Sequence, residues 1–420
     1  MNFDILIIGA GPAGLNAACT GAQAGANVGV VDDNALPGGQ IWRQGPRHRA
    51  AGPARALLDA LAKRPYVTLL NGTRIVQALP GRRLLAEDAS RALTLGYDRL
   101  IIASGARERF LPYPGWTLPG VTGAGGLQAL IKGGVPVRGE RIVIAGSGPL
   151  LWAAAATARQ HGATVAALVE QAPSQAVRRF AAGLARTPAK LAQALRMRFD
   201  LRATPYWCNA YVVEAIGTSR VTQARVRDGE DERLVDCDRL ACAYGLVPNT
   251  GLGAALGCRL TAQADSSAIA VDEWQRTSVD GVLAAGECAG VGGMELAAVE
   301  GRIAAHAALG ETADARQLFA ARERYRRFAA RLHAAFELAP ALRTLAQPDT
   351  VFCRCEDVAY GDVARHASWR DAKLQTRCGM GPCQGKICGD AAAFCFGWPQ
   401  HGQRPPFSPA RIETLLQGGS

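Results

Sequence analysis

Residues able to perform chemistry gather near the carboxyl end of this sequence, where half of the 12 cysteines lie within residues 353–395. A tight Cys-x-Cys pair precedes three evenly spaced cysteines: Cys353, Cys355, Cys378, Cys383 and Cys388. Four thiolates from two short pairs suit zinc or an iron–sulfur cluster, and the tight first pair favours iron–sulfur. Spacing alone leaves open whether Cys378 or Cys388 joins Cys383 in the second pair.

A second group of such residues begins the chain. An apolar run at 3–8 predicts a buried parallel strand, a helical pattern covers 15–24, and a second apolar strand covers 28–31. Gly-Ala-Gly-Pro-Ala-Gly at 9–14 lies between the first strand and the helix, and Asp32 ends the second strand. This order is typical of a dinucleotide-binding βαβ unit.

Each glycine of this turn has its own task in such a unit. Gly9 makes the tight turn, Gly11 lets a pyrophosphate approach the backbone, and Gly14 lets the helix pack closely on the strand. Asp32 directly ends the strand, so we expect it, rather than Asp33, to bind the adenosine ribose. The expected cofactor-binding residues here are Gly9, Gly11, Pro12, Ala13, Gly14 and Asp32.

The same pattern recurs in the middle of the chain. A buried strand at 141–145 leads into Gly146 and Gly148, then an alanine-rich helix and a strand that ends in Glu170. Leu151 replaces the third glycine, and we expect it to push the helix outward and distort the phosphate cradle. Gly146, Gly148 and Glu170 are candidate nucleotide-binding residues. The sequence leaves open whether this second site binds NAD(P), another adenine nucleotide or no ligand.

Composition excludes several classes of protein. The 420 residues are 49% hydrophobic and 20% charged, which is a globular balance that predicts two or three domains. The net charge of +11 comes from arginines that we take to be spread along the chain without a nucleic-acid recognition motif. We therefore expect no nucleic-acid partner. An acidic protein or an anionic membrane surface stays open as a partner.

The sequence also argues against membrane insertion and secretion. No apolar run reaches the roughly 18–20 residues that a spanning helix needs, and Asp4 stands where a signal peptide would carry positive charge. We expect a cytoplasmic protein, with peripheral association at the inner face of the membrane left open.

No catalytic side chain can be identified from the sequence. Residues 1–352 lack the closely spaced cysteine pair of a disulfide reductase; Cys19 is expected in the core, and Cys237 and Cys242 flank a strand. The six histidines are isolated.

A helical stretch at 313–345 either docks on the body of the protein or binds a partner, and docking is favoured. Trp116 either covers a flavin or packs an interface.

Six segments together carry a family resemblance: PGGQIWR at 37–43, PGWTLPGV at 114–121, GSGPLLW at 146–152, YGLVPNT at 244–250, ELAAVEGRIAA at 295–305 and TRCGMGPCQGKIC at 376–388. The chain resembles the FAD-binding A or α subunit of hetero-oligomeric opine oxidases, hydrogen cyanide synthase, and D-hydroxyproline or proline dehydrogenases. The resemblance covers nearly the whole chain.

The resemblance implies further cofactor contacts. It adds FAD-binding residues outside the first glycine turn: Gly39, Gln40, Ser104, Gly105, Gly286 and Glu287. In the family an aspartate usually stands at the place of Glu287. The carboxyl-terminal segment resembles a [2Fe–2S] domain of the bacterioferritin-associated-ferredoxin type. There the second cysteine pair follows the Gly-Met-Gly turn, which implies Cys353, Cys355, Cys383 and Cys388 as ligands.

The expected fold is a two-dinucleotide-binding-domain α/β flavoprotein with a small helical [2Fe–2S] domain. Residues 1–108 and 247–312 would form a split FAD domain, and 109–246 an inserted NAD-like domain. A helical bridge at 313–349 would lead to the [2Fe–2S] domain at 350–420.

The implied function is electron transfer within an amine, opine or imino-acid dehydrogenase. A partner FAD subunit would oxidise the C–N bond, and the further components would be an interface FMN and a small third subunit. This chain would pass electrons through FAD and [2Fe–2S] to an acceptor such as a quinone chain. The alternatives are an NAD(P)H-dependent reductase that uses the second glycine turn, and a non-enzymatic redox sensor.

Overall fold

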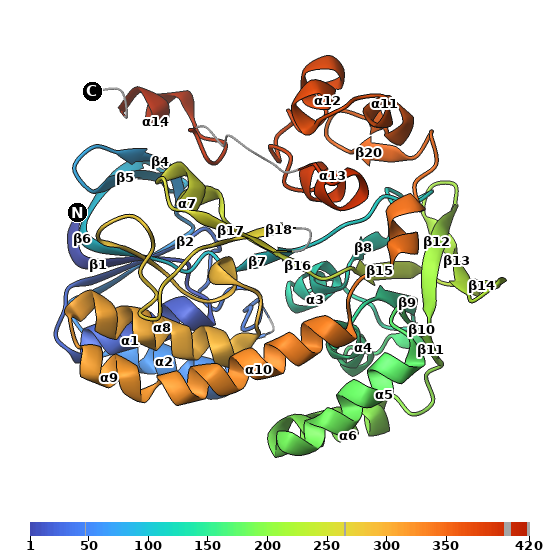
Figure 1. The fold of residues 1–420 in the computed structure, drawn as a ribbon, viewed down its shortest axis with the longest axis horizontal. Helices are drawn as coiled ribbons and strands as arrows, with labels where there is room; N and C mark the ends of the chain where they lie inside the picture. Colours follow the sequence, from blue (N-terminus) through green and yellow to red (C-terminus); the bar gives the residue numbers. More distant parts are fainter. Residues whose placement is uncertain (47, 264–265, 399–404, 418–420) are drawn as a thin grey trace. The chain divides into compact units, whose positions relative to one another are not determined.

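The computed structural model describes residues 1–46, 48–263, 266–398 and 405–417. Two compact units make up the chain (Figure 1). Unit 1 comprises Met1–Arg107, Val247–Ala329 and His401–Ser420, and unit 2 comprises Glu108–Leu246 and Ala330–Gln400. Each unit is built around its own hydrophobic core.

A seven-stranded sheet forms the centre of unit 1. Its strands lie in the order β3 (Val67–Asn71), β2 (Val28–Asp32), β1 (Asn2–Ile8), β6 (Ala92–Ile102), β5 (Arg83–Glu87) and β4 (Arg74–Leu79), and β19 (Val282–Ala284) also pairs with β6. The pairs β1–β2, β2–β3, β1–β6 and β6–β19 are parallel. Strand β1 is flanked by β2 on one side and β6 on the other. Its carboxyl end is therefore a topological switch point of the sheet, where ligands bind in open α/β sheets.

Helices cover this sheet. The helices within unit 1 include α1 (Pro12–Gln23), α2 (Gly52–Ala62), α7 (Gly251–Ala255), α8 (Met294–Leu309), α9 (Thr312–Gln317) and α14 (Ile412–Gln417). Helices α1 and α8 pack closely, because a Cβ added at Gly301 would lie 2.1 Å from the carbonyl oxygen of Ala13. Strands β17 (Leu260–Gln263) and β18 (Ser266–Ile269) form a small antiparallel pair.

Unit 2 contains a second parallel sheet. Its strands lie in the order β11 (Tyr206–Cys208), β10 (Thr164–Glu170), β9 (Arg141–Gly146), β15 (Arg239–Ala243) and β8 (Val121–Gly123). Helices α3 (Ala124–Lys132) and α4 (Leu150–Gln160) pack against it. Leu151 is fully buried in the core beneath α4. The unit β9–α4–β10 repeats the architecture of β1–α1–β2, as the repeated sequence pattern predicts.

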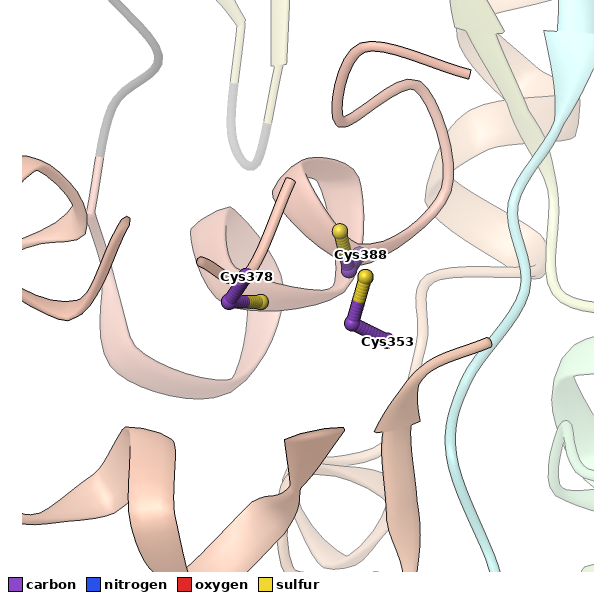
Figure 2. A group of neighbouring side chains, drawn as sticks. All are labelled: Cys353, Cys378 and Cys388. Carbon is purple, nitrogen blue, oxygen red and sulfur yellow. The ribbon is translucent and has the colours of Figure 1, made fainter. Parts of the chain in front are cut away.

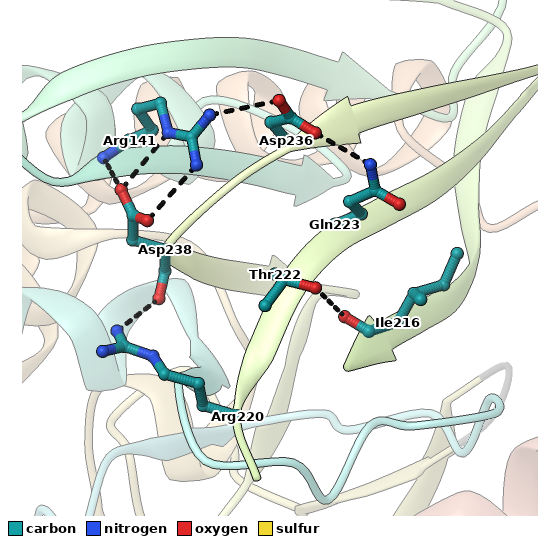
Figure 3. A network of polar contacts seen from close by, with 7 residues as sticks. All are labelled: Arg141, Ile216, Arg220, Thr222, Gln223, Asp236 and Asp238. Atoms are coloured by element: carbon teal, nitrogen blue, oxygen red, sulfur yellow. Dashed lines mark hydrogen bonds and ion pairs between the residues drawn. The ribbon is translucent and has the colours of Figure 1, made fainter. Parts of the chain in front are cut away.

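An antiparallel sheet of β12 (Ala210–Gly217), β13 (Val221–Asp228) and β14 (Asp231–Asp236) adjoins the parallel one. Figure 3 shows the polar contacts that join them at the start of β9. The guanidinium of Arg141 lies 3.2 Å from Asp236 and 3.4 Å from Asp238, and its backbone N–H donates to Asp238 at 2.7 Å. These contacts attach the start of β9 to the segment between β14 and β15.

The cysteine-rich segment folds within unit 2 as a small module, defined here as residues 348–398. It consists of β20 (Val351–Cys353), β21 (Val358–Ala359), α11 (Tyr360–Ala364), α12 (Trp369–Thr376) and α13 (Cys388–Phe396). Phe352, Val363 and Trp369 are buried at its centre together with Cys353, Cys378 and Cys388. The segment that leads to it includes α10 (Phe319–Ala335) and the 3-10 turn η3 (Pro340–Thr344).

The remaining elements complete the chain. They are β7 (Ala106–Glu108), α5 (Ser174–Gly183), η1 (Leu184–Arg186), α6 (Pro188–Asp200), β16 (Leu246–Pro248) and η2 (Glu287–Ala289). Among the described residues, no helix has both the length and the apolar character needed to cross a bilayer.

The last described segment does not belong to the cysteine module. Residues 405–417 fall in unit 1, where the hydroxyl of Thr414 donates to the carboxylate of Glu87 at 2.8 Å and the N–H of Phe407 donates to Val76 at 2.8 Å. The expected domain at 350–420 therefore differs from the units of the structure at this end. The boundaries expected at 108/109 and 246/247 lie within one residue of the unit boundaries.

Candidate functional site

The first glycine turn connects β1 to α1 and has the shape of a phosphate cradle. Gly9 has φ +111°, and a Cβ there would lie 2.3 Å from the carbonyl oxygen of Ala103. A Cβ at Gly14 would lie 1.8 Å from the carbonyl oxygen of Gly9. At Gly11, by contrast, the nearest atom to an added Cβ is 3.9 Å away. The turn thus requires two glycines for packing, whereas a Cβ at Gly11 would make only an ordinary contact with Gly39; a pyrophosphate would approach the helix N-terminus here.

Asp32 is buried at the end of β2, next to this turn. Its carboxylate accepts hydrogen bonds from the N–H of Ala10 at 2.6 Å and from the backbone and side chain of Asn34 at 2.8 and 2.7 Å. The side chain of Arg43 connects Asn34 to Gln40, with N–O distances of 3.2 and 2.8 Å. The structure therefore places the acid and Gln40 in one polar network beside the turn.

The loop that carries Gly39 passes directly over the glycine turn. The N–H of Gly38 donates to the carbonyl oxygen of Ala10 at 2.8 Å. A Cβ at Gly39, where φ is +60°, would lie 2.9 Å from the Cα of Gly11. Only glycine at this position permits so close an approach.

The other expected FAD contacts lie at the carboxyl ends of β6 and β19. The hydroxyl of Ser104 donates to the carbonyl oxygen of Asn249 at 2.8 Å, and the N–H of Asn249 donates to Gly105 at 2.9 Å. Gly286 begins the turn after β19, and a Cβ there would lie 2.8 Å from the Cβ of Ala13. Glu287 follows it, and burial raises the pKa of its carboxyl group.

The sequence reasoning missed an ion pair between the buried Glu300 and the partly exposed Arg326. Glu300 on α8 accepts from the N–H of Gly286 at 3.2 Å and from the guanidinium of Arg326 at 3.1 Å. Burial raises the pKa of Glu300, against the opposing effect of Arg326. The glutamate fixes the turn that carries Glu287. The sequence offered one indication of this role, because Glu300 belongs to the motif ELAAVEGRIAA at 295–305.

The first site therefore fits a dinucleotide cofactor. Its expected residues gather around the carboxyl ends of β1, β2, β6 and β19, at the switch point of the sheet. The glycine turn, an acid at the end of β2 and backbone N–H groups at the start of α1 are the features that bind a pyrophosphate and a ribose.

The second glycine turn has a similar backbone but different surroundings. Gly146 has φ +133°, and a Cβ there would lie 2.0 Å from the carbonyl oxygen of Ala243. Glu170 is fully buried, and its carboxylate accepts from the N–H groups of Gly148 at 2.7 Å and Ala172 at 2.9 Å. Burial raises the pKa of this carboxyl group to about 7.

A segment after α10, residues 336–339, lies across this turn. The hydroxyl of Ser147 donates to the carbonyl oxygen of Phe336 at 2.9 Å. The side chain of Gln171 donates to Glu337 at 3.0 Å and accepts from the N–H of Ala339 at 2.9 Å. A Cβ at Gly148 would lie 3.6 Å from the ring of Phe336. Residues 336–339 therefore bond to the second turn, and a dinucleotide would have to displace them in order to bind there.

The cysteine module contains a cavity of about 220 Å³. The cysteines that line it are Cys353, Cys355, Cys383 and Cys388. Cys353 ends β20 and Cys388 begins α13, whereas the other two lie in loops. The Gly-Met-Gly-Pro turn makes this arrangement possible, because a Cβ at Gly381 would lie 2.3 Å from the Cβ of Cys355. Four thiols around one cavity fit an iron–sulfur cluster.

A fifth thiol, Cys378, lies close to two of these four. The sulfur atoms of Cys353, Cys378 and Cys388 are within 4.8 Å of one another, and Figure 2 shows them turned toward a common space. Cys378 is fully buried and does not line the cavity. Hydrogen bonds from the thiols of Cys378 and Cys388 lower the pKa of Cys353. The N–H of Gly379 also donates to the sulfur of Cys353 at 3.5 Å.

Aromatic side chains from elsewhere in unit 2 close the cavity. Phe110 and Trp116 line it, with ring centroids 6.1 Å apart. The indole N–H of Trp116 donates to the carbonyl oxygen of Val351 at 2.6 Å, and the guanidinium of Arg354 lies 5.4 Å from the centre of the indole. Of the two roles left open for Trp116, the structure shows packing, here against the cysteine module.

The remaining cysteines do not form a redox-active pair. Cys19, Cys237, Cys242 and Cys288 are buried, and burial raises the pKa of each thiol. Every cysteine in the described part of the chain is a free thiol. The expectation that Cys19 lies in the core is confirmed.

A family model described as pyridine nucleotide-disulphide oxidoreductase matches residues 3–308. The chain belongs to this family. It is therefore a flavoprotein oxidoreductase with a Rossmann-like α/β fold, and FAD is the cofactor that the family assignment supports.

Two curated relatives show which members of this family the chain is similar to. The chain is 33% identical to hydrogen cyanide synthase subunit HcnB of Pseudomonas aeruginosa, covering 92% of this chain and 91% of that protein. It is 35% identical to the A subunit of opine oxidase of Rhizobium meliloti, covering 92% and 90%. The expected resemblance to opine oxidase and hydrogen cyanide synthase subunits is confirmed.

Solved structures agree on the fold. L-proline dehydrogenase from P. horikoshii superimposes with a TM-score of 0.70 at 17% identity, covering 99% of this chain and 79% of that chain. Thioredoxin reductase of T. acidophilum gives 0.58 at 24% identity, covering 74% of this chain and 99% of that chain. The cysteine module lies outside residues 3–308, which the family model matches.

Proposed function

We propose that this chain is the electron-transfer subunit of a hetero-oligomeric dehydrogenase that oxidises an amine, an opine or an imino acid. The observation that carries the proposal is a four-thiol cavity within a chain that also holds a flavoprotein fold. The similar proteins HcnB and the opine oxidase A subunit are, by name, subunits of larger enzymes. A partner FAD subunit would oxidise the substrate.

Cys353, Cys355, Cys383 and Cys388 are the proposed cluster ligands. A [2Fe–2S] cluster accepts one electron at a time, whereas FAD accepts two and releases them singly or together. The chain's own contribution is to hold four thiols around one space and to surround them with Phe110, Phe352 and Trp116. These side chains exclude water from one side of the site, and burial is one of the properties that set a cluster's potential.

The proposed FAD contacts are the residues gathered around the first glycine turn. The N–H groups at the start of α1 would bind the pyrophosphate, and Asp32 would bind the ribose after exchanging its bond to Ala10. Gly286 and Glu287 would lie nearest the flavin side of the cofactor. The buried Glu300 holds that turn in place.

The surroundings of the second glycine turn disfavour the alternative function of an NAD(P)H-dependent reductase. Phe336 and Glu337 occupy the place of a dinucleotide, and Glu170 is fully buried and bonded to the loop rather than presented to a ribose. We propose that electrons enter from the partner protein that oxidises the substrate, and not from NAD(P)H. An interface FMN, a quinone acceptor and a small third subunit belong to the same proposal.

The experiment is a comparison of the purified chain with the complex that it forms with neighbouring subunits of its source cell. We expect the isolated chain to show flavin absorption and the electron paramagnetic resonance signal of a reduced [2Fe–2S] cluster, but no dye reduction with opines or imino acids. The complex should reduce the dye. Substrate oxidation by the isolated chain at the rate of the complex would contradict the division between subunits.

A further inference from the structure

Helices α5 and α6 form a strongly cationic part of unit 2, called here the cationic arm (residues 174–202). Its 29 residues contain seven basic side chains and one acidic side chain, so it carries +6 of the chain's net +11. The basic residues are Arg178, Arg179, Arg186, Lys190, Arg196, Arg198 and Arg202. Six of the chain's arginines lie in this segment, at most two of them adjacent in sequence.

The arm is held to unit 2 by few side chains. Neither α5 nor α6 contains a buried residue, and the buried anchors are Leu184 between the helices and Leu201 after them. Phe180 packs edge-on against Phe336, with centroids 5.2 Å apart, and Arg198 lies 6.0 Å from the ring centre of Trp152. Figure 1 shows α5 and α6 following one another beyond α4. Most of the arm's surface is consequently accessible.

Two large apolar side chains project from this cationic surface. Leu195 and Phe199 lie one turn apart on α6 and are 61% and 65% exposed. The guanidinium of Arg202 lies 4.4 Å from the ring centre of Phe199. All six arginines of the arm are exposed. Their charge is thus available to an external anion.

We infer that the cationic arm binds the surface of a bilayer that contains anionic lipid. Leu195 and Phe199 would enter the boundary between headgroups and acyl chains, while Arg196, Arg198 and Arg202 would contact lipid phosphates. This is how cationic amphipathic helices lie at a membrane interface. Arginine suits the role because its long apolar stem can lie along the apolar layer while its charged end stays at the headgroups.

A bilayer fits the arm better than an acidic protein does. A stable protein interface contains roughly 20–30 residues on each side around an apolar centre. The arm offers two large exposed apolar side chains surrounded by positive charge. A membrane surface needs only a few inserted side chains, because the negative surface potential of anionic lipid acts on every basic residue near it. The inference uses neither the flavin nor the cluster, so it is independent of the proposed function.

The test is flotation of the full chain with phosphatidylcholine vesicles prepared with and without phosphatidylglycerol. We expect binding to the anionic vesicles, no binding to the neutral ones, and weakening by salt. Replacing Arg196 and Arg202 together by glutamine should weaken binding roughly 30-fold. The double variant Leu195→Gln/Phe199→Gln should lose at least as much. All four side chains are exposed, so these variants should fold, which circular dichroism checks.

Two controls match these variants. Lys63→Gln/Arg64→Gln removes two exposed charges from unit 1, and Leu234→Gln removes a leucine of unit 2 that is 56% exposed. Both should bind like the unchanged chain. The inference is overturned if the unchanged chain does not bind anionic vesicles, or if the arm variants bind as the controls do. Binding of the arm to another protein without any affinity for vesicles would also overturn it.

Discussion

Five cysteines compete for four positions in the proposed cluster, and the lining of the cavity separates them. Cys353 and Cys388 are buried and line the cavity, whereas Cys378 is equally buried but does not line it. Spacing could not make this choice, because Cys378, Cys383 and Cys388 are equally spaced. The distinction arises because α13 begins at Cys388 and directs that residue toward the end of β20.

Cys388→Ala should abolish the visible absorption of the cluster, because it removes a proposed ligand. Cys378→Ala should keep the absorption, since that thiol does not line the cavity. Cys395→Ala, which changes another thiol on α13, serves as the control and should resemble the unchanged chain. Absorption spectra and iron content of the purified variants measure this. Loss of the cluster in Cys378→Ala with retention in Cys388→Ala would refute the ligand assignment.

Glu170 should make the stability of unit 2 depend on pH. Burial raises its folded pKa from 4.5 to about 7, so the charged form is disfavoured in the folded state. The resulting loss of stability is absent below the unfolded pKa, grows as the pH rises and is complete above the folded pKa. Between about pH 4.5 and about pH 7.5 it amounts to roughly 3 kcal/mol.

Glu170→Gln removes this ionisation. Denaturant titrations should show that the decline in unfolding free energy over that range shrinks in Glu170→Gln, even if the variant is less stable at every pH. Glu323→Gln, which changes an exposed glutamate, is the control. An unchanged pH dependence in Glu170→Gln would show that the carboxyl group titrates normally.

At the scale of elements, two similar βαβ units have different surroundings. The loop that carries Gly39 lies over the turn between β1 and α1, while residues 336–339 lie across the turn between β9 and α4. The covering segment comes from a part of the chain that lies far from the turn in sequence. A glycine pattern predicts the turn, but it contains no information about which distant residues pack above it.

NADH should therefore fail to reduce the bound flavin rapidly under anaerobic conditions. The hydrogen bonds of Ser147 and Gln171 to residues 336–339 would have to break before a dinucleotide could bind. Stopped-flow absorption at the flavin band measures this, with dithionite as the positive control. Bleaching by NADH as fast as by dithionite would restore the reductase alternative.

At the scale of the whole molecule, two compact units each hold one proposed cofactor site. The glycine turn that fits FAD lies in unit 1, and the four-thiol cavity lies in unit 2. A ligand that binds only the folded state stabilises the unit that holds it. Loss of either cofactor should consequently destabilise one unit more than the other.

Calorimetry of two variants tests this separation. Gly14→Ala places a Cβ 1.8 Å from the carbonyl oxygen of Gly9 and should prevent FAD binding, lowering the midpoint of one thermal transition by several degrees. Cys388→Ala should lower the midpoint of the other. Gly183→Ala is the control, because a Cβ there meets nothing within 4 Å. A single transition shifted equally by both variants would show that the units unfold together.

The sequence by itself determined the local units of this protein. Apolar runs followed by glycine turns predicted both βαβ units, since buried strands and tight turns depend on residues close together in the chain. Motifs also predicted the family, which the comparisons confirm. Only the tertiary structure decided which cysteines share a cavity and what covers the second turn. Each of these depends on contacts between distant segments, which follow from how the elements pack and not from their individual patterns.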